Sequence, residues 1–217
     1  MENFYSRWIT EYCERIGNEF YSEPFNALSN IAFFVSAFFI YKLLKKHAIK
    51  SFGYWFLFTL LVLGSIGSLL WHSFRNPLTL SLDAVPIFIF FFTFVYLLLE
   101  QLTRSKRKAL ILLVSFFILQ VLASYVFPTF LNGSIRHVVN GIAFLGIVVW
   151  LYKKYANFSR HLPVAFLLYI LAILLRSIDN SVCSIFPVGT HFMWHVLNAA
   201  AAYFAIRALL KINSSNK

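Results

Sequence analysis

The chain has 217 residues, of which 60% are hydrophobic and 12% are charged, with a formal net charge of +11. A soluble domain carries about 25% charged residues, and a disordered chain has little apolar surface, so both classes are excluded. The two cysteines, Cys13 and Cys183, are too few for a disulfide framework or a four-thiolate metal site, and the class that remains is an integral membrane protein.

Seven long stretches without charge predict seven membrane-spanning helices, because a spanning helix needs about 20 mostly apolar residues. These runs lack the two-residue alternation of a membrane β-barrel, so the expected fold class is an all-α seven-helix bundle. It consists of an acidic N-terminal segment over 1–24, a transmembrane domain over 25–211 and a polar tail over 212–217. In chain order we expect helices near residues 25–44, 52–73, 82–102, 109–127, 135–152, 162–179 and 190–210.

The basic residues gather in alternate loops. Of the 19 lysines and arginines, 14 fall in the first, third and fifth loops and the C-terminal end, and five fall in the N-terminal segment and the other loops. The positive-inside rule then predicts an N-terminus outside and a cytoplasmic C-terminus. The net charge therefore reports topology and gives no support for a nucleic-acid partner.

The strongest local signal is a pair of histidines, His191 and His195, which lie four residues apart and so share one face of a helix. Such a pair can bind a metal, although interfacial histidines near a helix start would show the same spacing. The expected topology adds His72, at the end of the second helix, and Asp83, at the start of the third, on the same outer side. Three histidines and one carboxylate are thus predicted at one membrane depth.

Three neutral imidazoles with one open position are typical of a catalytic zinc site, where the metal lowers the pKa of a bound water to about 7. Asp83 could accept a proton from that water. Ser68 lies one helical turn before His72 and could hydrogen-bond a developing oxyanion. The alternatives are structural: Ser68 as a helix-packing serine and Asp83 as the N-cap of the third helix.

A second polar cluster precedes the first helix. Its carboxylates could form a calcium site, since calcium prefers carboxylate and carbonyl oxygens, or they could be a solvated tail with helix-capping groups. The cluster consists of Glu11, Glu14, Glu23, Asn26, Ser29 and Asn30.

Near the end of the sixth helix, Arg176 and Asp179 have the spacing of an ion pair.

Several motifs, in order along nearly the whole chain, carry a resemblance to a known family. They are Tyr12-Cys13-Glu14, Glu23-Pro24-Phe25-Asn26-Ala27-Leu28-Ser29-Asn30, Ser68-Leu69-Leu70-Trp71-His72, Leu82-Asp83-Ala84-Val85-Pro86, and Gly189-Thr190-His191-Phe192-Met193-Trp194-His195. With these motifs the chain resembles the alkaline ceramidases of the CREST superfamily, seven-helix membrane hydrolases that also include the adiponectin receptors. The compact loops and short tails look like those of a bacterial member, so the expected location is the bacterial inner membrane.

The resemblance implies a zinc ion held by His72, His191 and His195, with Ser68 and Asp83 as catalytic partners. It also implies a calcium site built from an acidic N-terminal motif, onto which Glu11, Glu14 and Glu23 fall. The motif departs from the family at three places: Tyr12 replaces a tryptophan, Ile16 stands where an asparagine is expected, and the segment up to Glu23 is shorter.

The resulting hypothesis is a zinc-dependent lipid amidase that cleaves ceramide-like lipids of the bilayer into a fatty acid and a sphingoid base. Two rivals stay open. One is a zinc hydrolase of the same fold that cleaves another lipid bond, such as a phospholipid ester. The other is a non-catalytic seven-helix receptor or membrane-stress protein with a structural metal.

Overall fold

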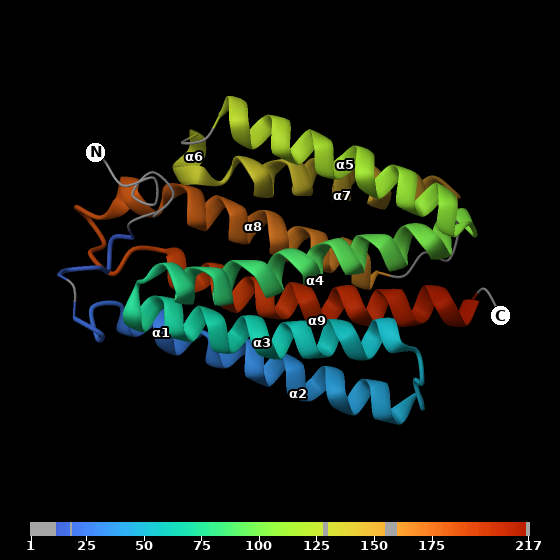
Figure 1. The fold of residues 1–217 in the computed structure, drawn as a ribbon, viewed down its shortest axis with the longest axis horizontal. Helices are drawn as coiled ribbons and strands as arrows, with labels where there is room; N and C mark the ends of the chain where they lie inside the picture. Colours follow the sequence, from blue (N-terminus) through green and yellow to red (C-terminus); the bar gives the residue numbers. More distant parts are fainter. Residues whose placement is uncertain (1–11, 18, 128–129, 155–159, 216–217) are drawn as a thin grey trace.

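A computed structural model describes residues 12–17, 19–127, 130–154 and 160–215, and within these ranges the regular structure is entirely helical. The described part of the chain begins and ends at opposite ends of the bundle, as an odd number of crossings requires (Figure 1). The helices are α1 (Pro24–Ser29), α2 (Ile31–Lys46), α3 (Phe52–Phe74), α4 (Pro77–Thr103), α5 (Lys106–Val126), α6 (Phe130–Gly133), α7 (Ile135–Lys154), α8 (His161–Val182) and α9 (His191–Ser215).

Seven helical spans in the described part of the chain are long and apolar enough to cross a membrane, so the predicted seven-helix fold is confirmed. The first crossing joins α1 and α2 over Pro24–Lys46, and the other six are α3, α4, α5, α7, α8 and α9. Which end faces the outside is not fixed by the fold and stays a prediction.

The start of the third predicted span, which is helix α4, differs from the expected residue 82. Helix α4 begins at Pro77, because Asn76 caps it: the Asn76 side chain accepts a hydrogen bond from Thr79 N, and the Thr79 hydroxyl accepts one from Asn76 N. Proline at the first helical position completes this start signal. Asp83 therefore lies inside α4. The alternative in which Asp83 is the N-cap of this helix is wrong.

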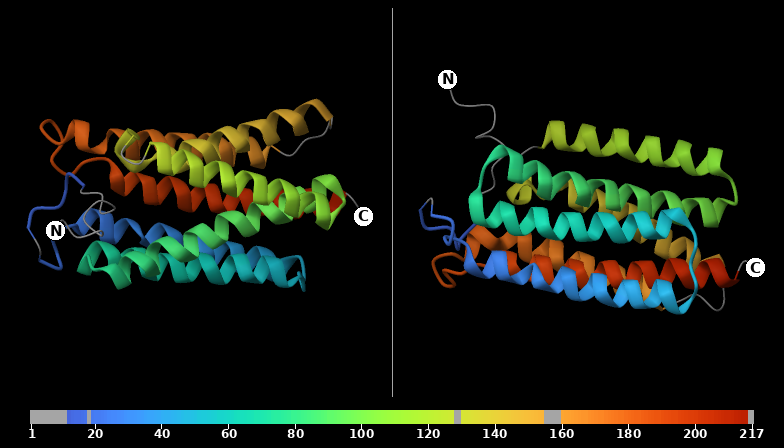
Figure 2. Two further views of the ribbon diagram at one scale, coloured as in Figure 1. Left: turned by 45° about the horizontal axis from the view of Figure 1, so that its top comes forward. Right: turned by 60° about the horizontal axis from the view of Figure 1, so that its bottom comes forward.

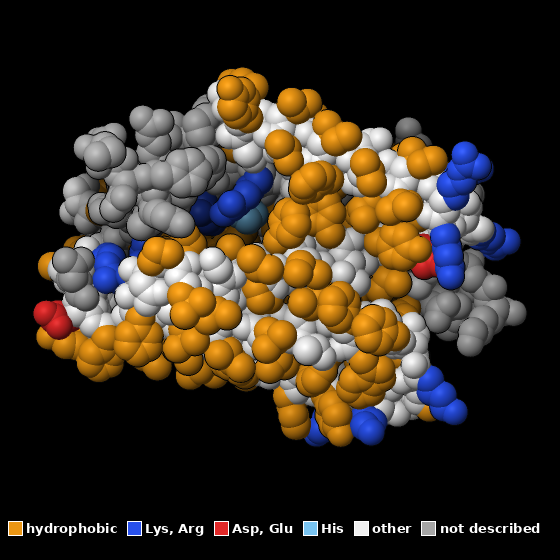
Figure 3. Space-filling view, in the orientation of Figure 1, with side chains coloured by type: hydrophobic (Ala, Val, Ile, Leu, Met, Phe, Trp, Pro, Cys, Tyr) orange, Lys and Arg blue, Asp and Glu red, His pale blue; other side chains and the backbone are white. Residues whose placement is uncertain are grey.

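Helix α9 runs through the middle of the bundle and α5 lies at its edge (Figures 1 and 2). Half of the apolar window of α9 is buried, against 11% of that of α5. The face in Figure 3 is covered by hydrophobic side chains along its middle, while basic side chains gather at the end where the chain terminates. This distribution is that of a multi-pass membrane protein with a lipid-facing apolar belt.

A disulfide between Cys13 and Cys183 closes the N-terminal segment onto the turn after α8. Nothing in the sequence pattern predicts this pairing, because the two cysteines are 170 residues apart. Next to it Gly189 has a φ of +67°, and a Cβ there would lie 2.7 Å from Cys13 Cβ, so only glycine fits. The turn before α9 and the N-terminal segment are thereby held against each other.

Candidate metal centre

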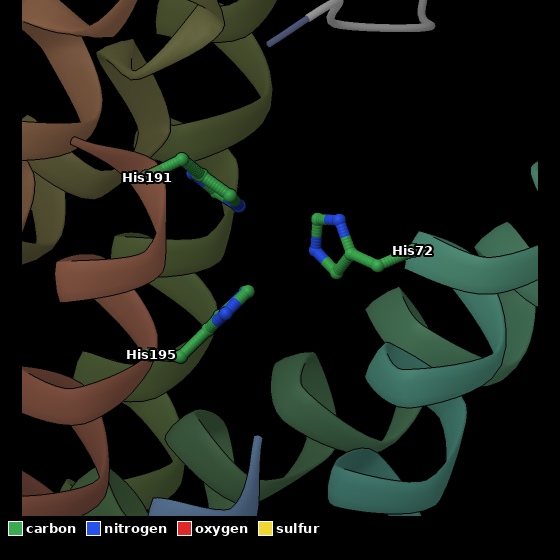
Figure 4. A group of neighbouring side chains, drawn as sticks. All are labelled: His72, His191 and His195. Carbon is green, nitrogen blue, oxygen red and sulfur yellow. The ribbon is translucent and has the colours of Figure 1, made fainter. Parts of the chain in front are cut away.

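The three predicted histidines meet at one end of the bundle, which we call the histidine end (Figure 4). His72 comes from the last turn of α3, and His191 and His195 come from the first two turns of α9. All three are buried, and one nitrogen from each lies within 4.8 Å of the others. The three histidines that the sequence placed at one membrane depth therefore lie close together, although they come from helices far apart in the sequence.

The hydrogen bonds of two histidines leave their second nitrogens available. His72 Nδ1 lies 2.6 Å from Glu23 Oε2, and His195 Nδ1 lies 2.7 Å from Ser29 Oγ. A metal-ligating histidine commonly donates its other N–H to such an oxygen, which fixes the tautomer and the ring orientation. Both imidazoles can then offer Nε2 to one metal ion.

The third histidine is held differently. The backbone N–H of His191 donates to Asp179 Oδ1 at 2.9 Å, and its ring stacks on Tyr12 with a centroid distance of 3.6 Å. Its Nδ1 is buried and has no hydrogen-bond partner within the described residues. A buried imidazole nitrogen without a partner is costly in protein alone, and a metal ligand role would satisfy it. These residues therefore fit a zinc ion.

Ser68 and Asp83 meet because α3 and α4 touch at Gly67. A Cβ on Gly67 would overlap the carbonyl oxygen of Leu82 and lie 2.6 Å from Asp83 N, so the two helix backbones are in direct contact there. The Ser68 side chain hydrogen-bonds the Asp83 carboxylate, and Ser68 lies one helical turn before His72 on α3. The structure therefore brings the two predicted catalytic partners together near His72.

The described carboxylates of the predicted calcium site are engaged by hydrogen-bond donors. Glu14 accepts from the backbone N–H of Phe25 at 2.5 Å and of Asn26 at 2.8 Å, so it caps α1. Burial raises the pKa of Glu14, against the lowering effect of these two hydrogen bonds. Glu11 lies outside the described residues.

Glu23 is surrounded by cationic groups. Its Oε1 lies 2.8 Å from Arg15 Nη1 and 2.7 Å from both Arg75 Nε and Arg75 Nη2. Burial alone would raise the pKa of Glu23, but the hydrogen bond with His72 and the charges of His72 and Arg75 outweigh it and hold the pKa at about 2. Calcium needs oxygen ligands without competing cations, so the described residues do not fit a calcium ion.

Sequence reasoning missed the roles of Tyr12, Arg15 and Arg75, which depend on contacts between distant segments. It also assigned Asp179 to an ion pair with Arg176. Instead the Asp179 carboxylate accepts the backbone N–H groups of Cys13, Thr190 and His191, and so fixes the start of α9. Arg176 donates to Ser134 Oγ at 2.6 Å.

A seven-helix membrane protein with such a histidine cluster at one end falls in the class of candidate membrane metalloenzymes. The sequence model of the ceramidase family matches residues 9–217, which is nearly the whole chain. The chain belongs to the ceramidase family, a family of hydrolases, and the resemblance drawn from the motifs is confirmed. No curated protein matches the chain.

Proposed function

We propose that the protein is a zinc-dependent amidase that hydrolyses ceramide-like membrane lipids to a fatty acid and a sphingoid base. The observation that carries the proposal is the convergence of three buried imidazole nitrogens within 4.8 Å of one another. Membership of the ceramidase family supplies the substrate class. Zinc suits a set of neutral imidazoles, and when bound it would polarise the amide carbonyl and lower the pKa of a water molecule.

Asp83 is the proton carrier in this proposal. Amide hydrolysis forms a C–O bond from water and breaks the C–N bond, so one proton must move from the attacking water to the leaving nitrogen. Oδ1 of Asp83 has no hydrogen-bond partner within the described residues, while the carboxylate is anchored by Ser68. One carboxylate oxygen is therefore available to take the proton and to deliver it.

Ser68 is the proposed oxyanion donor. It is buried, lies one turn before His72 on α3, and contacts Asp83. A hydroxyl fixed in this way can turn its proton toward the negative oxygen that develops on the amide carbonyl.

We further propose that the histidine end faces the outside. The asymmetry of basic loops supports this orientation. The disulfide between Cys13 and Cys183 at the same end supports it too, because disulfides persist in oxidising compartments.

The test uses purified full-length protein with zinc, long-chain ceramide in mixed micelles, and mass spectrometry of the products. We expect release of the sphingoid base, with a loss of roughly a hundredfold or more in Asp83→Asn, which keeps the shape of the side chain but cannot take a proton. Zinc content should stay at wild-type level in this variant. Intact ceramide alongside cleaved glycerophospholipid would overturn the substrate class, and wild-type turnover by Asp83→Asn would overturn the mechanism.

A further inference from the structure

Two arginines, Arg15 and Arg75, contact Glu23, which is one of the glutamates onto which the resemblance places a calcium site. We propose that Arg15 and Arg75 act as built-in cations that hold Glu23, and through it the metal ligand His72, so that the centre works without calcium. The inference rests on the proposed zinc site.

Both oxygens of the buried Glu23 carboxylate have hydrogen-bond donors. Its side chain is fully buried, and those of Arg15 and Arg75 are 11% and 6% exposed. Both guanidinium groups meet the same oxygen, Oε1, at 2.7 to 2.8 Å. The other oxygen, Oε2, faces His72 Nδ1 at 2.6 Å and Asn26 Nδ2 at 3.1 Å. Each carboxylate oxygen therefore already has donors, and a cation added here would meet two fixed positive charges.

Arg75 lies at the end of α3, where its side chain contacts two aromatic rings. Arg75 has a φ of +45° as the residue that ends α3, a conformation that favours glycine. A glycine there would relieve the backbone but would remove the guanidinium. The guanidinium carbon lies 4.5 Å from the Trp71 ring centroid and 5.0 Å from that of Tyr12, so the side chain is fixed on both aromatic rings.

The end of α3 brings His72 and Arg75 to the same carboxylate. His72 lies in the last turn of α3 and Arg75 is the residue that ends it, and both contact the carboxylate of Glu23. Arg75 binds one oxygen, which turns the other toward Nδ1 of His72. Groups that orient a metal ligand in this way usually change metal affinity by about 10- to 100-fold when removed. Arg15 and Arg75 are positioning residues in this sense.

The first arm of the experiment uses wild-type protein and calcium alone. Zinc content is held constant, and thermal unfolding and isothermal titration calorimetry are recorded in EGTA and with added calcium. We expect no stoichiometric calcium binding and no change in Tm. Binding of one calcium ion with a rise of several degrees in Tm would overturn the inference.

The second arm measures zinc affinity by chelator competition in Arg75→Gln and Arg15→Gln. We expect a weakening of about tenfold in each, and a smaller loss in Arg75→Lys, which keeps the charge but not the forked contact. Arg104→Gln is the matched control, because Arg104 also ends a helix with a positive φ, of 52°, but is exposed at the opposite end of α4. It should leave zinc affinity unchanged.

The outcomes separate the inference from the proposed function. Unchanged zinc affinity in all three variants at Arg15 and Arg75 would overturn the positioning role while the zinc site stands. A wild-type protein that binds no zinc would overturn the proposed function, and the calcium arm would still report on the arginines. If Arg75→Gln does not fold, Arg75→Lys and the wild-type arm decide.

Discussion

At the scale of single residues, the histidine end is organised by buried carboxylates with different partners. Glu23 faces two guanidinium groups and an imidazole, whereas Glu14 faces two backbone N–H groups. A buried carboxylate is stable only when charge or hydrogen bonds compensate for the lost water. The two glutamates should therefore respond to acid in opposite ways.

The prediction at this scale concerns pH. The pKa of Glu23 is about 2 in the folded protein against 4.5 for an ordinary glutamate. As the pH falls, the unfolded chain therefore binds a proton at Glu23 before the folded protein does. Stability from Glu23 is therefore complete above about pH 4.5 and is lost as pH falls toward 2, by about 3 kcal/mol in total. Thermal unfolding from pH 6 to pH 3 measures this loss.

The control variant for the pH series is Glu23→Gln. Burial raises the pKa of Glu14, so Glu14 has the opposite pH dependence, and it is present in both proteins. The difference in Tm between wild type and Glu23→Gln isolates Glu23 and should shrink as the pH falls below 4.5. A difference that stays constant over this range would contradict the assigned contacts.

At the scale of elements, the position of Asp83, the proposed proton carrier, depends on the contact between α3 and α4. Gly67 lets the two backbones touch beside Leu82 and Asp83. Small residues allow this close approach between helices in membranes. Asp83 is placed beside Ser68 by this contact and not by a capping role at the start of α4.

We predict that Gly67→Ala separates α3 and α4 and lowers ceramide hydrolysis strongly, because the added methyl group would overlap a backbone carbonyl oxygen. Overpacking of this kind costs about 1–3 kcal/mol of stability. The control is Gly146→Ala on α7, where a Cβ would meet no atom within 4 Å. It should keep activity and a Tm at or above that of wild type. Equal activity in both variants would show that the contact does not place Asp83.

Patterns within single helices were predictable, and contacts between helices mostly were not. Apolar stretches and charge runs predicted the seven spans, and topology placed His72 with His191 and His195 at one end. The start of α4 was missed because its capping residues, Asn76 and Thr79, precede the apolar run. The arginine contacts of Glu23 were missed because spacing along the chain does not show which charges meet across folded segments.

At the scale of the whole molecule, the histidine end depends on a cross-link between the beginning and the last quarter of the chain. The disulfide joins cysteines 170 residues apart. It holds the segment that carries Tyr12, Glu14 and Arg15 over the metal centre. Such a cross-link stabilises mainly by restricting the unfolded chain.

We predict that Cys13→Ser lowers stability by about 2–4 kcal/mol, or roughly 5–15 °C in Tm. It should also weaken zinc binding, because Tyr12 and Arg15 lose their anchor. Reductant should lower the Tm of wild type by a similar amount and leave that of Cys13→Ser unchanged. A wild-type Tm that does not respond to reductant under unfolding conditions would count against the role of the disulfide.

The same cross-link can form only late in the synthesis of the chain. Cys13 leaves the ribosome early, yet Cys183 follows 170 residues later, a delay of about 10–30 s at ordinary elongation rates. His191 and His195 come later still, so α3 crosses the membrane with His72 long before the other two imidazoles exist. The cluster of three imidazoles is thus completed only when α9 has been made, and a chain that stops before α9 lacks two of the three.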